Sequence, residues 1–186
     1  MEVRTVGRMI FRKVKNILEA SLEVLVTVAM VVLVLDVVWG VFTRFVLGHQ
    51  SAWTEELARF LMIWVGLLGA SVALNRGAHL GIDYFVGKLS SNKRVHTELF
   101  AFLCVALFSF SVLFIGGSRL VHSTLVTNQI SPALGVKMGY VYFAVPISGF
   151  FLTLYSVEFF IEKLMGHIKG KEVEGPAESD SAAGID

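Results

Sequence analysis

Residues 17–47 read ILEASLEVLVTVAMVVLVLDVVWGVFTRFVL, a predominantly apolar run that is interrupted by Asp36 and Arg44. A helix needs roughly 20 mainly apolar residues to cross a bilayer. The run exceeds the core of a secretory signal, and no clear small-x-small cleavage site follows it. We therefore interpret it as an uncleaved first membrane span.

Three further apolar runs of suitable length follow, at about residues 54–75, 97–117 and 138–160. Hydrophobic residues make up 55% of the chain and charged residues 17%, and this balance lies outside the usual soluble range. The sequence predicts an all-α integral membrane protein with four transmembrane helices. We expect residues 1–168 to form the membrane domain and residues 169–186, rich in Glu, Ser, Gly and Ala, to form a disordered cytoplasmic tail.

The segments between the spans differ in character. Residues 1–16 alternate basic and apolar side chains, which predicts a short interfacial helix. Residues 48–51 form a short polar turn, so the first two spans are expected to make an antiparallel hairpin. Residues 75–94 are partly amphipathic and predict a surface connection, and residues 118–137 predict a polar loop.

The basic residues predict the orientation, because short cytoplasmic loops carry an excess of Lys and Arg. The N-terminal segment holds five, the central loop four and the C-terminal segment three, whereas the other two loops hold only Arg119 and Lys137. Both termini and the central loop are therefore expected on the cytoplasmic side of the membrane.

The same composition argues against several other classes of function. A net charge of +1 gives no reason to expect nucleic acid, and the single Cys104 excludes an intrachain disulfide or a cysteine metal cluster. A haem-binding membrane subunit needs axial histidines inside its spans. All five histidines are instead expected in loops or at helix ends, and they are His49, His79, His96, His122 and His167. No nucleophile–base arrangement appears either, so we predict no catalytic centre, metal or cofactor.

Asp36 falls near the middle of the first span, where a carboxylate costs about 2.5–3.5 kcal/mol on the insertion scale. It is not expected to face lipid. One interpretation is an ion or proton site. We favour a structural role, in which a neutral or hydrogen-bonded acid locks the helix against a partner, because no second acid or polar run accompanies it.

Four charged residues flank the turn between the first two spans. Arg44 precedes it, and Glu55, Glu56 and Arg59 follow it, after a possible helix cap at Ser51 or Thr54. We expect the four to form one cluster near the far-side interface. Two acids balanced by two arginines indicate a structural clamp rather than catalysis.

Small residues recur four apart in the second span, at Gly66 with Ala70 and at Gly69 with Ala73. This spacing permits close helix approach in lipid. It predicts packing either within this bundle or against another subunit.

Three segments carry a resemblance to a known family. They are Trp53-Thr54-Glu55-Glu56-Leu57-Ala58-Arg59, Gly77-Ala78-His79-Leu80-Gly81-Ile82-Asp83 and Tyr142-Phe143-Ala144-Val145-Pro146. Together they resemble the small membrane subunit of tripartite ATP-independent periplasmic (TRAP) transporters. The sequence departs from that pattern at Ser90, where a proline would often follow Leu89.

The resemblance implies a heteromeric transporter of the bacterial inner membrane rather than an enzyme. A large multi-span membrane subunit would move the substrate, a periplasmic substrate-binding protein would deliver it, and uptake of an organic acid would be driven by sodium. The small subunit would act as a scaffold. In this scheme Trp53, Glu55, Glu56 and Arg59 organise the helix start, Pro146 belongs to the last span, and Gly77, His79 and Asp83 shape the cytoplasmic loop.

Two other functions remain open on the sequence alone. One is the membrane anchor of a redox enzyme, and the other is a self-contained small transporter or channel. Membrane lipids are expected around the protein in every case.

Overall fold

The computed structural model describes residues 2–49, 51–76 and 91–173, with side chains described in 17–49, 51–76 and 96–166. The chain is helical almost throughout. Its elements are α1 (Glu2–Val46), α2 (Ala52–Asn75), α4 (Ser91–Phe108), the π-helix η1 (Ser109–Gly116), α5 (Gly117–Val126), α6 (Met138–Tyr142) and α7 (Ala144–Val173).

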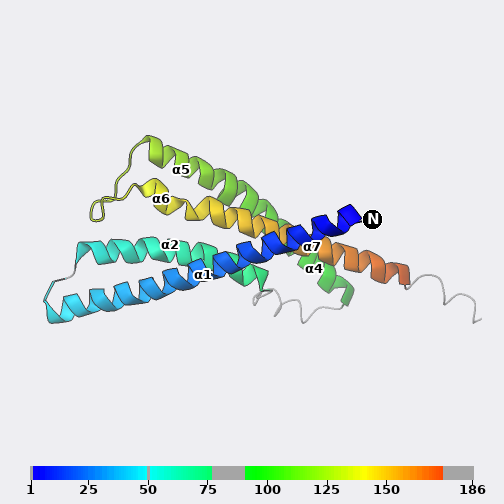
Figure 1. The fold of residues 1–186 in the computed structure, drawn as a ribbon, viewed down its shortest axis with the longest axis horizontal. Coiled ribbons are helices and arrows are strands. Elements are labelled where there is room, and N and C mark those ends of the chain that lie inside the picture. Colours follow the sequence, from blue (N-terminus) through cyan, green and yellow to red (C-terminus); the bar gives the residue numbers. More distant parts are fainter. Residues whose placement is uncertain (1, 50, 77–90, 174–186) are drawn as a thin grey trace, which may run out of the picture.

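The helices form two antiparallel hairpins (Figure 1). The first pairs α1 with α2, and the second pairs the continuous rod α4–η1–α5 with α6 and α7. The turns at residues 47–51 and 127–137 lie at the same end of the molecule, which we call the turn end; the other we call the open end. Helix α2 lies against both α1 and α7 and so joins the hairpins.

Within the described residues, four helical stretches are long and apolar enough to cross a membrane, as the sequence predicts. They are Ile17–Val46, Ala52–Asn75, His96–Val126 and Met138–Gly166. Helix α1 begins at Glu2 and continues without a break into the first stretch. The predicted interfacial segment at residues 1–16 is thus the beginning of one long helix where its backbone is described.

The prediction that the third span stops at Gly116 and Gly117 was wrong. The helix continues to Val126, so the first half of the expected polar loop is helix α5. Both glycines have ordinary helical angles, and a Cβ on Gly117 would lie 2.8 Å from Val145 Cγ1. The glycine therefore permits close contact with the last span, where the sequence pattern had indicated a helix end.

The fourth span is broken once, at Phe143, between α6 and α7. Pro146 is the third residue of α7, where its missing N–H would have no intrahelical partner in any case. The break therefore accommodates the proline without a freed carbonyl in the helix interior. Helix α7 ends at Val173, beyond the predicted tail boundary at 168, and residues 174–186 lie outside the described residues.

Small residues allow the helices of the core to approach closely. Leu22, Leu68, Leu74 and Tyr155 form a buried cluster around α2. The Ser71 hydroxyl donates to the Leu67 and Ser148 carbonyls at 3.2 and 3.4 Å, which links α2 to α7. A Cβ on Gly149 would lie only 2.6 Å from the backbone nitrogen of Phe114, so α7 meets η1 at backbone contact. Packing of this kind, rather than apolar transfer, holds helices together in lipid.

Candidate subunit interface

Helix α2 begins at the turn end, but neither expected cap is made. Ser51 occupies the N-cap position with φ −73° and ψ 124°, yet its side chain makes no capping hydrogen bond. The buried Thr54 hydroxyl donates to the Ser51 carbonyl at 2.7 Å. Thr54 thereby turns inward toward α1, where its hydroxyl oxygen would lie 3.4 Å from a Cβ on Gly40.

The four charged residues near this turn do not form the single cluster that the sequence predicts. Glu55 and Arg59 pair at 3.6 Å on the surface of α2, with 64% and 67% of their side chains exposed. Arg44 is exposed, and among the described residues it takes part in no ion pair. Glu56 lies about 100° further round the helix than Glu55, so it faces the other hairpin.

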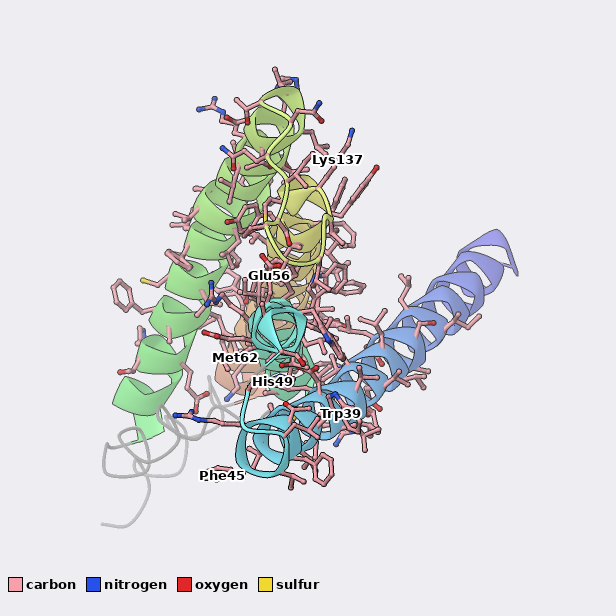
Figure 2. The ribbon with its side chains drawn as sticks, turned by 90° about the vertical axis from the view of Figure 1, so that its left-hand side faces the viewer. Trp39, Phe45, His49, Glu56, Met62 and Lys137 are labelled. Carbon is pink, nitrogen blue, oxygen red and sulfur yellow. The ribbon has the colours of Figure 1, made fainter. Side chains whose placement is uncertain are left out.

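Glu56 instead holds the loop at residues 131–134. One carboxylate oxygen accepts hydrogen bonds from the backbone nitrogens of Ala133 and Leu134, both at 2.9 Å. The loop is itself ordered by a bond from the Ser131 nitrogen to the Val136 carbonyl at 2.9 Å. Figure 2 shows Glu56 on the side of α2 that faces α6. We call this contact the Glu56 clasp, and it joins the two hairpins at the turn end.

Removing the Glu56 carboxylate is expected to release this loop. In Glu56→Ala, the Ala133 and Leu134 amides lose their acceptor, so their hydrogen exchange should become several-fold faster. Glu55→Ala removes the neighbouring acid, which pairs with Arg59 instead, and should leave these two amides unchanged. Exchange measured by mass spectrometry on the purified chain checks both variants, and equal exchange in Glu56→Ala and wild type would contradict the clasp.

Sequence reasoning missed two ion pairs at the open end. Arg76, after α2, pairs with Glu23 of α1 at 3.0 Å, and Lys163 of α7 pairs with the buried Glu98 of α4. Each pair closes one hairpin. The signal was present, because Glu23 and Glu98 are acids near the ends of spans and each antiparallel partner span ends near a basic residue.

Asp36 lies in the seam between α1 and α2. The side of α1 that faces α2 is marked by Leu22, Asp36, Gly40 and Thr43, all of them buried. Asp36 is 6% exposed, and neither carboxylate oxygen has a hydrogen-bond partner. It lines a cavity of about 490 Å³ with Gly40 of α1 and Ala58 of α2, and the arginines Arg44 and Arg59 line the same cavity.

The small residues of α2 face outward. Gly66 and Ala70 are exposed, and a Cβ on Gly66 would have no atom within 4 Å. Of the two alternatives that the sequence left open, this pair therefore does not pack within the bundle, and contact with another subunit stays a prediction. Met62 and Ala73 are exposed on the same face. We call Met62, Gly66, Ala70 and Ala73 the small-residue face of α2. Trp53 is also exposed, in the first turn of the helix.

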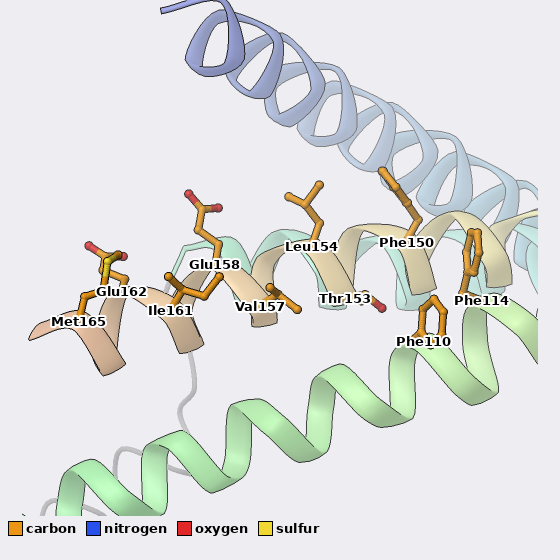
Figure 3. Close-up of a pocket in the computed structure, with 10 residues that line it drawn as sticks. All are labelled: Phe110, Phe114, Phe150, Thr153, Leu154, Val157, Glu158, Ile161, Glu162 and Met165. Carbon is orange, nitrogen blue, oxygen red and sulfur yellow. The ribbon is translucent and has the colours of Figure 1, made fainter. Parts of the chain in front are cut away.

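A second groove lies along α7 (Figure 3). It has a volume of about 810 Å³ and is lined mainly by apolar side chains, including Phe110, Phe114, Phe150 and Val157. Glu158 and Glu162 stand at the end of the groove nearer the open end. Apolar side chains are also exposed along α1, among them Trp39 and Phe45, which are labelled in Figure 2.

Gly77, His79 and Asp83 lie outside the described residues, so their predicted loop role stays a prediction. His122, expected in a loop, is on α5 within the third span. Within the described part of the chain, no three His, Cys, Asp or Glu residues lie close enough to hold a metal ion.

This arrangement defines a class of protein. It is a multi-pass helical membrane protein whose few charges are mostly used in internal contacts and whose apolar outer faces are left to lipid or to other subunits. A family comparison specifies the class further. The model of the DctQ component of tripartite ATP-independent periplasmic transporters matches residues 33–166. Because the match spans more than half of the chain, the protein belongs to this family.

Individual relatives agree with the family assignment. The chain is 28% identical over 148 residues to the sialic acid TRAP transporter small permease protein SiaQ of Vibrio cholerae, which is 79% of this chain and 82% of SiaQ. It is 30% identical over 100 residues to the C4-dicarboxylate TRAP transporter small permease protein DctQ of Rhodobacter capsulatus, covering 54% of this chain and 44% of that protein. It is also 35% identical over 72 residues to the sialic acid TRAP transporter permease protein SiaT of Haemophilus influenzae, covering 37% of this chain and 12% of SiaT.

The resemblance to the small TRAP subunit drawn from the sequence motifs is thus confirmed. These proteins are transporter subunits and not enzymes, so the chain is a small permease subunit of a TRAP transporter.

Proposed function

We propose that this chain is the scaffold of a large permease subunit that takes up an organic acid, driven by sodium and supplied by a periplasmic binding protein. The observation that carries the proposal is the similarity to SiaT. Only 12% of that permease protein matches this chain, so a much longer permease contains a segment related to it. A separate small subunit is then expected to stand beside the large one in the membrane.

The distribution of polar groups supports a scaffold. Glu56, Arg76 and Lys163 are engaged in contacts within the chain. In the described part, Asp36 has no hydrogen-bond partner and the exposed Arg44 has no ion pair. A transport pathway needs a succession of polar groups across the bilayer. The transported acid is therefore expected to bind on the large subunit and the binding protein.

The chemical class of the substrate rests on the relatives. Sialic acid and C4-dicarboxylates, which the names of two relatives specify, are both carboxylic acids. This supports an organic acid for the present transporter.

The orientation proposed is that of the sequence analysis, with both termini in the cytoplasm of a bacterium and the turn end in the periplasm. The excess of Lys and Arg in the terminal and central segments supports it. The Glu56 clasp would then lie on the periplasmic side. Gly77, His79 and Asp83 would shape the cytoplasmic loop.

Reconstitution tests the proposal directly. Vesicles that contain this chain and the large subunit should accumulate substrate only with the binding protein and an inward sodium gradient. Vesicles that contain this chain alone should accumulate none, because its described residues offer no succession of polar groups across the bilayer. Control vesicles carry the complex without a sodium gradient. Substrate accumulation by this chain alone, or full uptake by the large subunit without it, would refute the scaffold role.

A further inference from the structure

Asp36 is a buried acid whose carboxylate makes no hydrogen bond. It lies within the first membrane stretch, Ile17–Val46, and both carboxylate oxygens are covered by the chain without a partner. A buried carboxylate without a partner is costly in any medium of low polarity. An ionisable residue at membrane depth is therefore a candidate functional group whose partner has to be identified.

Within the described residues, no cation pairs with Asp36, although Arg44 and Arg59 line the same cavity. Arg44 lies two helical turns away, about 12 Å along the axis. Arg59 pairs with Glu55 at 3.6 Å on the exposed surface. The missing partner must therefore come from outside.

The surroundings of Asp36 leave room for such a partner. Gly40 and Ala58 are small, and with Asp36 they line the cavity of about 490 Å³ between α1 and α2. Met62 also lines this cavity and is 63% exposed, so the cavity opens onto the small-residue face of α2. A Cβ on Gly66 would meet nothing within 4 Å, so another helix can approach α2 closely along this face.

The chemistry of the cavity selects among possible occupants. Metal cations such as Ca²⁺ and Mg²⁺ take six or more oxygen ligands. The carboxylates that line the cavity are Asp36 and Glu55, and Glu55 is already paired with Arg59. This set supplies too few free oxygen ligands for such a cation. A lipid phosphate is repelled by the carboxylate, and a lipid tail offers no donor. A guanidinium or ammonium group on a helix needs only one carboxylate and brings its own donors.

We infer that the cavity at Asp36 and the small-residue face of α2 receive a transmembrane helix of the large permease subunit, which places a Lys or Arg side chain against Asp36. This rests on the proposed partnership with that subunit. The incoming side chain displaces the Asp36 carboxylate from its covered position toward the cavity. The pair then fixes the depth at which the two subunits meet in the membrane.

Two variants of Asp36 test the charge. Asp36→Leu and Asp36→Asn leave the partner's cation unpaired in the interface, so each should weaken the complex on the order of a hundredfold. Glu162→Gln, an exposed acid on α7, is the matched control and should leave assembly unchanged. Co-purification of each tagged variant with the large subunit, followed by titration in nanodiscs, measures the effect.

The stability of the isolated chain distinguishes a role of Asp36 in binding the large subunit from a role in stabilising its own chain. Asp36→Leu removes an unsatisfied buried carboxylate from the free subunit, so its melting temperature in detergent should rise by several degrees while the complex weakens. A lower melting temperature would show that Asp36 stabilises its own chain and would overturn the inference.

Photo-crosslinking locates the contact. A crosslinking residue in place of Met62 should capture the large subunit, whereas one in place of the equally exposed Leu35, which does not line the cavity, should not. Equal complex formation by wild type and both Asp36 variants would overturn the inference and leave the scaffold proposal standing. If Asp36→Asn assembled normally and Asp36→Leu did not, the partner of Asp36 would be a neutral hydrogen-bond donor and not a cation. That result would also overturn the inference. A wild-type chain that never binds the large subunit would instead refute the proposed function.

Discussion

Replacing Gly149 with leucine is expected to separate α7 from η1. A Cβ at this position would lie 2.6 Å from the Phe114 nitrogen and 2.8 Å from the Leu113 carbonyl carbon. Both are backbone atoms, so no side chain can turn aside to relieve the clash. The free energy of unfolding is expected to fall by about 3 kcal/mol, the upper part of the range for overpacked cores. This loss should appear as a marked drop in melting temperature in detergent.

Gly166 provides the matched control on the same helix. A Cβ there would meet nothing within 4 Å, so Gly166→Leu should gain helix propensity and stabilise the chain slightly. The two substitutions are identical in composition and opposite in expected sign. Similar melting temperatures for both variants would contradict backbone contact between α7 and η1.

Truncating Leu68 to alanine is expected to cost about 1–3 kcal/mol. Leu68 is 1% exposed and lies with Leu22, Leu74 and Tyr155 in the core cluster where α2 meets both α1 and α7. In lipid the separated helix keeps its leucine in an apolar solvent, so little transfer energy is lost. What remains is the cavity and the lost dispersion contacts, which makes the expected loss smaller than in a soluble core.

Leu107→Ala removes the same atoms from an exposed position on α4 and should change stability little. Unfolding of both variants in mixed micelles by increasing denaturing detergent measures the difference. Equal unfolding midpoints would indicate that the α2 core is not packed as described.

The four spans were predictable because each needs only a long apolar run, and the bilayer imposes that requirement on each helix separately. The end of the third span was not. Gly116 and Gly117 suggest a stop when considered alone, and only the presence of Val145 and Pro146 across the hairpin explains why a helix retains Gly117 there. Helix-helix contacts of this kind involve residues far apart in the sequence.

The candidate interface was predictable in its residues but less so in their pairing. The sequence placed Glu55 and Glu56 at the start of one helix. Adjacent helical residues point about 100° apart, so Glu55 pairs with Arg59 whereas Glu56 contacts the loop at residues 131–134. Asp36 was expected to be covered, and it is. The outward direction of Gly66 depends on which side of α2 meets α7, and composition alone does not contain this information.

The lengths of the membrane helices have a consequence for the lipid around the subunit. The four stretches contain 30, 24, 31 and 29 residues. At a rise of 1.5 Å per residue even the shortest measures about 36 Å, whereas the hydrocarbon layer is about 30 Å thick. Helices longer than the hydrocarbon layer tilt or locally thicken the bilayer, and a tilted helix covers more membrane area than an upright one. In the proposed complex, we therefore expect the subunit to enlarge the membrane area of the transporter and to adjust the thickness of the bilayer around the larger permease.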